Sequence, residues 1–129
     1  EGIIITNTLM SFKNGQKINE KFWLCYLNSN FTSWYAYNFI YARAIRGIDF
    51  YDFYIQQIPI PNISLSVQNI FIPIVDQIIE EKKKGKGTSV LEQKADCLIY
   101  HIFGFTYNEV KVIDPSFSLK QIEYESIKL

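Results

Sequence analysis

The sequence predicts an α+β fold that is mainly helical, with a small β element at its N-terminus. Apolar residues recur at helical spacing through most of the chain after residue 19, and helix-starting and helix-ending residues bracket these stretches. Strand-like residues are confined to 3–13. With 129 residues, 48% of them hydrophobic, the chain is long enough for one packed domain and too short for two ordinary ones.

The first elements are the β element and an aromatic helix. Residues 3–13 are expected to form one or two strands, followed by a turn at residues 14–15. Asn19 is expected to cap a helix that runs to about Asn28 and carries aromatic residues on its apolar face.

A second helix starts at Asn30 or Phe31 and is apolar on nearly all sides before Arg43. A helix of this kind is expected to be buried or pressed against a partner. Gly47 is expected to end it as a C-terminal cap. The aromatic segment 46–54 is then expected to be non-helical.

The run Ile58-Pro59-Ile60-Pro61 forms a strap between the two halves of the chain. Its prolines fix φ and remove backbone donors, so the strap can be neither helix nor central strand. The strap divides the β element and aromatic helices in residues 1–61 from a helical region in residues 62–129. We expect both regions to belong to one compact domain.

After the strap, Ser66 is expected to cap a helix that reaches Lys84. Pro73 interrupts its apolar pattern, so the helix is either kinked there or begins nearer residue 71. A glycine-containing loop at residues 85–87 closes this segment.

Three capping boxes predict the remaining helices. The first of these helices is ended by Gly104, the second stops before Asp114-Pro115, and the third frays after Ser126. The boxes are Ser89 with Glu92, Thr106 with Glu109, and Ser118 with Gln121.

Composition narrows the class of protein. The 13 basic and 13 acidic side chains give none of the basic excess that a dedicated nucleic-acid module usually shows. No apolar run approaches the roughly 18 residues of a membrane span. Cys25 and Cys97 lack the spacing of a zinc motif and are expected to be buried free thiols, which predicts a cytoplasmic location. No signal peptide is visible, and the chain opens directly into the predicted strand at Ile3 with nothing before it, which favours a piece of a larger protein.

No group of residues predicts catalysis by this chain. His101 is the only histidine, so a paired-histidine metal site is excluded, and its amphipathic surroundings favour a packing role. Asp76, Glu80, Glu81 and Lys82 are residue types found in magnesium-dependent nucleases, but they lie at an exposed helix end instead of in a sheet. No glycine-rich phosphate loop or adenosyl-binding motif is present. We therefore expect no catalytic residue, metal or cofactor here.

Candidate DNA contacts lie in and beside the aromatic segment. Aromatic side chains stack on bases or wedge into base steps, and arginine makes bidentate contacts with guanine and phosphate. Asp49 and Asp52 would repel a phosphate backbone, so some residues of the segment favour DNA contact and others oppose it. The aromatic helices upstream suit a protein core or interface. The candidates are Arg43, Arg46, Tyr51 and Phe53.

A second candidate is the only dense cluster of basic residues. One interpretation is a solvated helix end whose positive charges suit the helix dipole. The other is a set of phosphate contacts. The cluster consists of Lys82, Lys83, Lys84 and Lys86.

Three motifs carry a family resemblance. The first is Tyr-Leu-Asn-Ser-Asn at residues 26–30, and the second is Arg-Gly leading to Gln-Ile-Pro-Ile-Pro over residues 46–61. The third and most specific spans residues 91–110, with Leu-Glu, Ala-Asp and Phe-Gly-Phe-Thr in order. Together they resemble the C-terminal part of adenine-specific DNA methyltransferases of restriction–modification systems. That group includes type IIG enzymes and enzymes with a TaqI-like C-terminal specificity domain.

The resemblance implies a parent protein that methylates adenine N6 from S-adenosylmethionine, with or without an attached restriction activity. The family's Asn-Pro-Pro-Tyr type motif is absent, so catalysis would belong to an upstream domain. Residues 1–61 would contain the end of the target-recognition β unit, and residues 62–129 its helical support. The implied partners are double-stranded DNA and the upstream methyltransferase domain.

Two other hypotheses remain open. In the first, the chain is a structural or interaction module related to type I restriction specificity subunits, and helices 19–45 and 66–84 pack against partner subunits. Its aromatic helices and zero net charge fit that hypothesis. In the second, the chain is a stand-alone magnesium-dependent nuclease.

Overall fold

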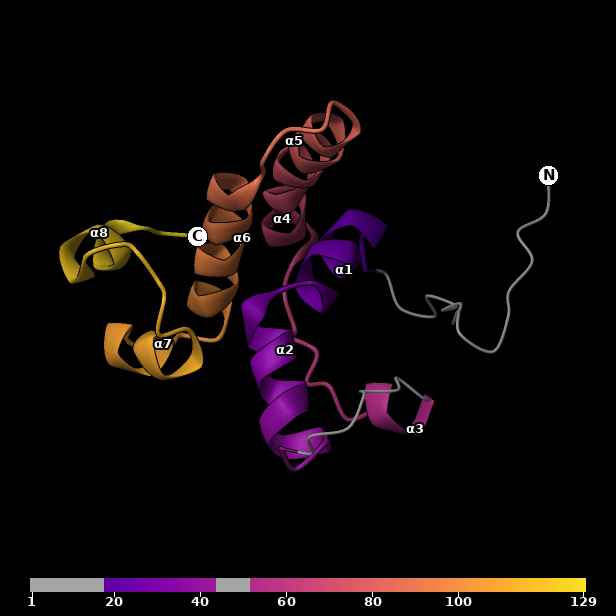
Figure 1. The fold of residues 1–129 in the computed structure, drawn as a ribbon, viewed down its shortest axis with the longest axis vertical. Helices are drawn as coiled ribbons and strands as arrows, with labels where there is room; N and C mark the ends of the chain where they lie inside the picture. The colour runs from indigo at the N-terminus through magenta and orange to yellow at the C-terminus, as the bar shows by residue number, and fades with distance from the viewer. Residues whose placement is uncertain (1–17, 44–51) are drawn as a thin grey trace.

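Residues 18–43 and 52–129 are described by the computed structural model, and all their regular elements are helices (Figure 1). The mainly helical class predicted from the sequence is therefore confirmed for these residues. The strands and turn predicted within residues 3–15 lie outside the described residues, so the β element stays a prediction.

The first two helices begin where the sequence predicts. The Asn19 side-chain oxygen accepts hydrogen bonds from two backbone N–H groups in the first turn of α1 (Glu20–Leu27), which confirms Asn19 as the cap. Ser29 caps α2 (Asn30–Tyr35), because its hydroxyl accepts from the Thr32 N–H at 3.1 Å.

The aromatic helix ends earlier than predicted. α2 continues into η1 (Ala36–Ile40), a π-helical turn in which the Tyr41 N–H bonds to the carbonyl five residues back at 2.9 Å. Ala42 and Arg43 then adopt positive φ angles of 47° and 58°. Because these left-handed residues end the helix, the predicted end at Gly47 is wrong.

α3 (Asp52–Ile55) is a single helical turn within the predicted non-helical segment, so that prediction is wrong for its last residues. The strap at residues 58–61 is neither helix nor strand, as its prolines require. Ile58 is buried in the core, and the Tyr26 hydroxyl donates to the Pro59 carbonyl oxygen. The strap is therefore held against α1.

Two helices replace the single one predicted after the strap. α4 (Leu65–Asn69) is capped by Ser64, whose hydroxyl accepts from a first-turn N–H at 3.3 Å, so the cap at Ser66 is wrong. α5 (Phe71–Lys83) has Pro73 as its third residue. A first-turn N–H has no partner inside a helix, so a proline is tolerated there. The predicted alternative of a start near residue 71 is confirmed.

Gly104 terminates α6 (Ser89–Ile102) from two residues beyond its last helical residue, as predicted. Gly104 has φ 68°, which glycine adopts without strain. Its N–H bonds to the His101 carbonyl at 3.0 Å, and the Phe105 N–H bonds to the Tyr100 carbonyl at 3.1 Å. These two bonds form a Schellman motif, which pairs carbonyls that the helix end would leave free.

The Thr106 capping box forms as predicted at the start of α7 (Tyr107–Ile113), where Thr106 and Glu109 bond reciprocally. α7 then stops before Asp114, again as predicted. The predicted box of Ser89 with Glu92 is wrong, because Ser89 is already the first residue of α6.

The third box, Ser118 with Gln121, is also wrong. α8 (Gln121–Ser126) starts directly after Lys120, whose N–H donates to the Glu123 carboxylate at 2.8 Å. The Ser118 hydroxyl lies too early to cap this helix and donates to the Gln93 side-chain oxygen at 3.0 Å.

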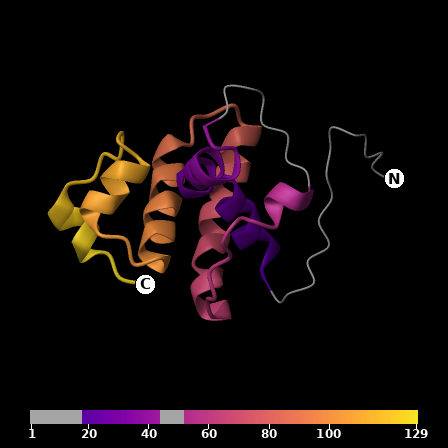
Figure 2. The same ribbon diagram turned by 90° about the horizontal axis from the view of Figure 1, so that it is seen from below.

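The helices form a bundle around α6 (Figures 1 and 2). α6 packs against α5 and α2, α1 packs against α5 and α2, and α7 packs against α2 and α8. None of the helices in the described ranges has both the length and the apolar character that crossing a membrane requires. The largest fully buried side chains are Tyr26, Tyr100, Tyr124, Phe22, Phe71, Ile99, Val110 and Cys97.

Candidate nucleic-acid interface

The aromatic helix is buried at its start and exposed at its end. Phe31 in α2 is 3% exposed, whereas Tyr37 and Phe39 in η1 are 45% and 61% exposed. Phe53 in α3 is 71% exposed. The predicted burial is therefore confirmed for one side of this helix as far as Ala36, which is 1% exposed, and the last turn presents aromatic rings to the surface.

One ring contact brings Tyr41, the residue after η1, against α3. Phe39 lies edge-on to Trp34, with ring centroids 5.4 Å apart, and its centroid is 5.1 Å from that of Tyr35. Across the gap between the described ranges, the Tyr41 and Tyr54 centroids are 4.9 Å apart. We call this surface the aromatic face; it consists of Tyr37, Phe39, Tyr41, Phe53 and Tyr54.

Arg43 is held beside the aromatic face. Its backbone N–H bonds to the Tyr37 carbonyl at 2.9 Å, and its Nε donates to Asn38 Oδ1 at 3.1 Å. The Asn38 Nδ2 in turn donates to the Trp34 carbonyl at 2.8 Å. The Arg43 side chain is exposed, and no carboxylate among the described residues pairs with it.

Two of the four candidates in the aromatic segment are placed by the structure. Arg43 follows η1, and Phe53 lies in α3 against Tyr54, with ring centroids 5.6 Å apart. The contact between η1 and α3 brings both to the same end of the molecule (Figure 1). Arg46 and Tyr51 lie outside the described residues, so their contact with DNA stays a prediction.

Glutamates neutralise most of the lysine cluster at the end of α5. Lys83 is exposed and pairs with no carboxylate of the described residues. The others form ion pairs: Lys82 with Glu92 at 2.8 Å, Lys84 with Glu80 at 2.5 Å, and Lys86 with Glu81 at 3.1 Å. Exposed pairs of this kind are weak, so a phosphate can displace the glutamates.

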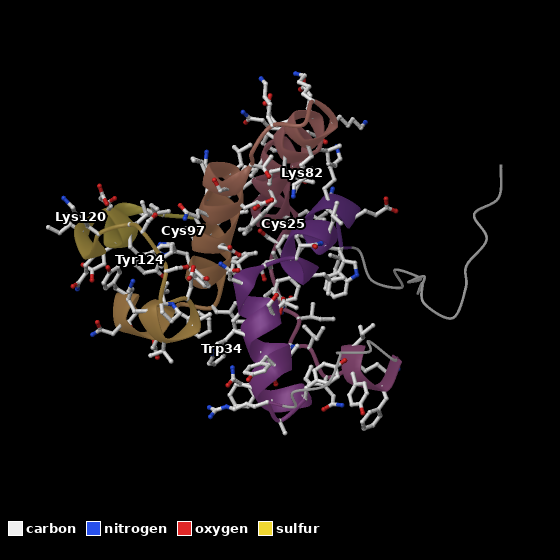
Figure 3. The ribbon with its side chains drawn as sticks, viewed as in Figure 1. Cys25, Trp34, Lys82, Cys97, Lys120 and Tyr124 are labelled. Atoms are coloured by element: carbon white, nitrogen blue, oxygen red, sulfur yellow. The ribbon has the colours of Figure 1, made fainter. Side chains whose placement is uncertain are left out.

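The two candidate groups lie at opposite ends of the molecule. The last turn of α5 stands at the top of Figure 1, whereas η1 and α3 form the bottom. Figure 3 shows the same separation in side chains, with Lys82 near the top and Trp34 near the bottom. The structure therefore does not join the arginine and lysine candidates into one basic patch.

The acidic residues considered for a nuclease are paired with lysines. Asp76 bonds to Lys21 of α1 with an N–O distance of 2.5 Å, and Glu80 and Glu81 pair with the lysine cluster. In residues 18–43 and 52–129, no group of three or more histidine, cysteine or acidic side chains is arranged to hold a metal ion.

The single histidine and the two cysteines have packing roles. The His101 ring stacks on Tyr124 with centroids 4.2 Å apart, as its predicted packing role requires. Cys97 is buried as predicted, but Cys25 is only half-buried. Burial raises the pKa of Cys25 to about 12 and that of Cys97 to about 11, and the charge of Asp96 adds to both. Both thiols are therefore protonated at neutral pH.

Sequence reasoning missed a buried polar network at the start of α2. Asp96 of α6 is 7% exposed and accepts from the Asn30 N–H at 2.9 Å, while the Asn30 Nδ2 donates to Asp114 at 3.2 Å. The Tyr100 hydroxyl is buried without a hydrogen bond to any described residue. A signal existed, since Asp96 follows Ala95 and precedes Ile99 on the apolar side of the helix pattern.

Comparison of this chain with protein-family models, with curated proteins and with solved structures finds no match. The family resemblance therefore depends on the three sequence motifs alone, and the candidate interface depends on the geometry described above.

Proposed function

We propose that this chain is a non-catalytic recognition and support domain at the C-terminal end of a cytoplasmic, adenine-specific DNA methyltransferase of a restriction–modification system. The observation that carries the proposal is the exposed aromatic face with Arg43 beside it. The three motifs within residues 26–110 support the choice of family. S-adenosylmethionine would bind to the upstream domain, and the end of the β unit would lie within residues 1–61.

Arg43 has the chemistry for a DNA contact. Its Nε donates to Asn38, and no described residue bonds to the outer edge of the guanidinium, so that edge can make a bidentate contact with a phosphate or a guanine. Its exposure and the absence of a paired carboxylate among the described residues keep its charge available. Arg46 and Tyr51 would extend this contact.

The aromatic rings would add contacts that charge alone does not provide. Phe39 and Phe53 present large exposed rings, which can wedge into a base step or stack on an unpaired base. A methyltransferase that extrudes its target adenine disrupts stacking at that position. An aromatic side chain nearby can stabilise the disrupted duplex.

The lysine cluster would contact the phosphate backbone at a distance from the aromatic face. Lys83 is available directly, whereas Lys82, Lys84 and Lys86 would exchange a glutamate for a phosphate. Phosphate contacts of this kind fix the register and orientation of a protein on the duplex without reading its sequence.

The test is fluorescence anisotropy of the full gene product on labelled duplex DNA while the salt concentration is raised. Arg43→Ala is expected to weaken binding roughly tenfold, or about 1.4 kcal/mol, and to reduce the salt slope by about one. Lys94→Ala removes one exposed positive charge from the middle of the bundle and serves as the matched control. Equal behaviour of the two variants would contradict a specific role for Arg43.

A second candidate function is that of an interaction module related to type I specificity subunits. The observation that favours it is the size of the exposed rings on the aromatic face, since aromatic residues are enriched in protein interfaces. In that case Phe53→Asp would abolish co-elution with the methyltransferase subunit in size-exclusion chromatography and leave DNA affinity unchanged. Loss of DNA affinity with intact co-elution would favour the primary proposal instead.

A further inference from the structure

A cavity of about 430 Å³ lies between α1, α5 and α6, away from the aromatic face. Sites for small molecules typically enclose roughly 300–1,000 Å³, so this cavity is large enough for one. Much of its wall is aliphatic, with Leu24, Val75, Ile78, Ile79 and Ala95 among the lining residues. Figure 3 shows Cys25 between α6 and α1, and Lys82 above it at the end of α5; both line the cavity.

The chemically distinctive group in this wall is the Asp96 carboxylate. The residue is 7% exposed, and its Oδ1 accepts from the Asn30 N–H at 2.9 Å. Its Oδ2 has no hydrogen bond to any described residue. Among the described residues, the fully buried side-chain atom without a hydrogen bond is the Tyr100 hydroxyl, so Asp96 Oδ2 is open to the cavity that its residue lines. A carboxylate that is mostly removed from water favours a positively charged donor at such an opening.

The chain supplies no cation to this carboxylate in the described residues. Lys82 lines the same cavity, but its Nζ lies 2.8 Å from the Glu92 carboxylate. Glu92 also accepts from the Thr88 hydroxyl at 2.8 Å, which holds it in that pair. The charges of Lys82 and Glu92 therefore balance each other. A positive charge that pairs with Asp96 must come from a bound partner.

The remaining polar groups of the cavity define the charge of that partner. The Asn28 Nδ2 donates to the Leu24 carbonyl at 2.8 Å, so its side-chain oxygen remains as an acceptor. The Asp96 carboxylate disfavours an anion, while the Glu92 charge is already balanced by Lys82. A divalent metal is disfavoured as well, because the described residues provide no group of three ligands. A group with several N–H donors and one positive charge fits best.

We propose that the cavity binds a small apolar primary amine, whose ammonium group pairs with the Asp96 carboxylate while its hydrocarbon part contacts the aliphatic wall. This site is separate from the aromatic face, and it shares Lys82 with the proposed phosphate contacts. The ammonium N–H groups would donate to Asp96 Oδ2 and the Asn28 side-chain oxygen. The positive charge of the ligand would balance the Asp96 carboxylate.

The test is titration of the full chain with benzylamine, followed by amide chemical shifts in ¹H–¹⁵N NMR spectra. The largest shifts are expected in α1, α5 and α6 around the cavity. Benzyl alcohol, which has a similar shape and no charge, is expected to bind about 10–100-fold more weakly, the range for a hydrogen bond to a charged group. Equal affinity for both probes, or shifts scattered over the surface, would overturn the proposal.

Two variants separate the charge from the shape of the site. Asp96→Asn keeps an acceptor for the Asn30 N–H and is expected to bind benzylamine as weakly as benzyl alcohol. Ile79→Phe is expected to fill part of the cavity and to weaken both probes together. If Asp96→Asn fails to fold, Ile79→Phe with the benzylamine and benzyl alcohol pair still decides the case. Undiminished benzylamine binding in either folded variant would contradict the assignment.

Discussion

Two adjacent left-handed residues position the Arg43 guanidinium. Ala42 and Arg43 have φ of 47° and 58°, a region where a β-carbon crowds the backbone. They persist because the Arg43 N–H bonds to the Tyr37 carbonyl and its side chain bonds to Asn38. Strained residues of this kind cluster at functional sites, which supports the place of Arg43 in the proposed interface.

Replacing Ala42 with glycine is expected to stabilise the protein. Glycine adopts φ 47° without strain, so the free energy of unfolding should rise by about 0.5–1 kcal/mol. Urea denaturation followed by circular dichroism measures this change. Ala36→Gly, at a helical position in η1, is the control and is expected to lower stability by about 1 kcal/mol. A lower free energy of unfolding for Ala42→Gly would contradict backbone strain at Ala42.

Asp96 is expected to make stability depend on pH. Burial raises the pKa of Asp96 to about 6 from an ordinary 3.8; the charges of Asp114 and Glu92 add to this, and the Asn30 N–H opposes it. Because the folded state holds this proton more tightly than the unfolded state, the stabilisation is complete below pH 4 and is lost as pH rises through 6. The neighbouring Lys82 is paired with Glu92 and does not offset this.

The corresponding measurement is urea denaturation of the wild type and Asp96→Asn at a series of pH values. Between pH 4 and pH 7, the wild type is expected to lose on the order of 2 kcal/mol of unfolding free energy relative to Asp96→Asn. A pH-independent difference would show that Asp96 titrates normally in the folded protein.

At the scale of helices, a capping side chain determines where most of the helices start. The wrong predictions of helix starts chose a residue close to the true cap. Asn19 and Thr106 cap as their sequences predict. Ser66 fails because Ser64 stands two residues earlier, in extended backbone suited to a cap. Either serine could cap a helix on the sequence pattern alone. Which one does so depends on where the extended backbone of the strap ends.

Thr106 and Ser89 provide a direct test of helix capping. Thr106→Ala removes a formed capping box and is expected to lower the free energy of unfolding by about 1 kcal/mol. Ser89→Ala is the matched control and should change it little, because Ser89 makes no capping bond. Thermal unfolding of both variants measures the difference. Equal losses in the two variants would mean that Ser89 caps α6 in solution.

At the scale of the whole molecule, the mainly helical class follows from apolar spacing, but the arrangement of sites does not. The cap between Asp96 and Asn30 joins residues from α6 and α2, which no local pattern connects. The lysine cluster and Arg43 are separated because α5 and η1 end at opposite ends of the bundle (Figure 1). Sequence reasoning could identify these residue types, whereas their distances depend on how the helices pack.

This separation predicts how the two ends act together on DNA. Arg43→Ala and Lys83→Ala change groups that share no partner among the described residues, so their effects on DNA-binding free energy should add within about 0.5 kcal/mol. Fluorescence anisotropy of the two single variants and the double variant measures this at one fixed salt concentration. Additive losses would mean that one duplex contacts both ends of the bundle. A loss for Arg43→Ala alone would restrict the interface to the aromatic face and assign the lysine cluster to the solvated end of α5, where glutamates of α5 and α6 already pair with Lys82, Lys84 and Lys86.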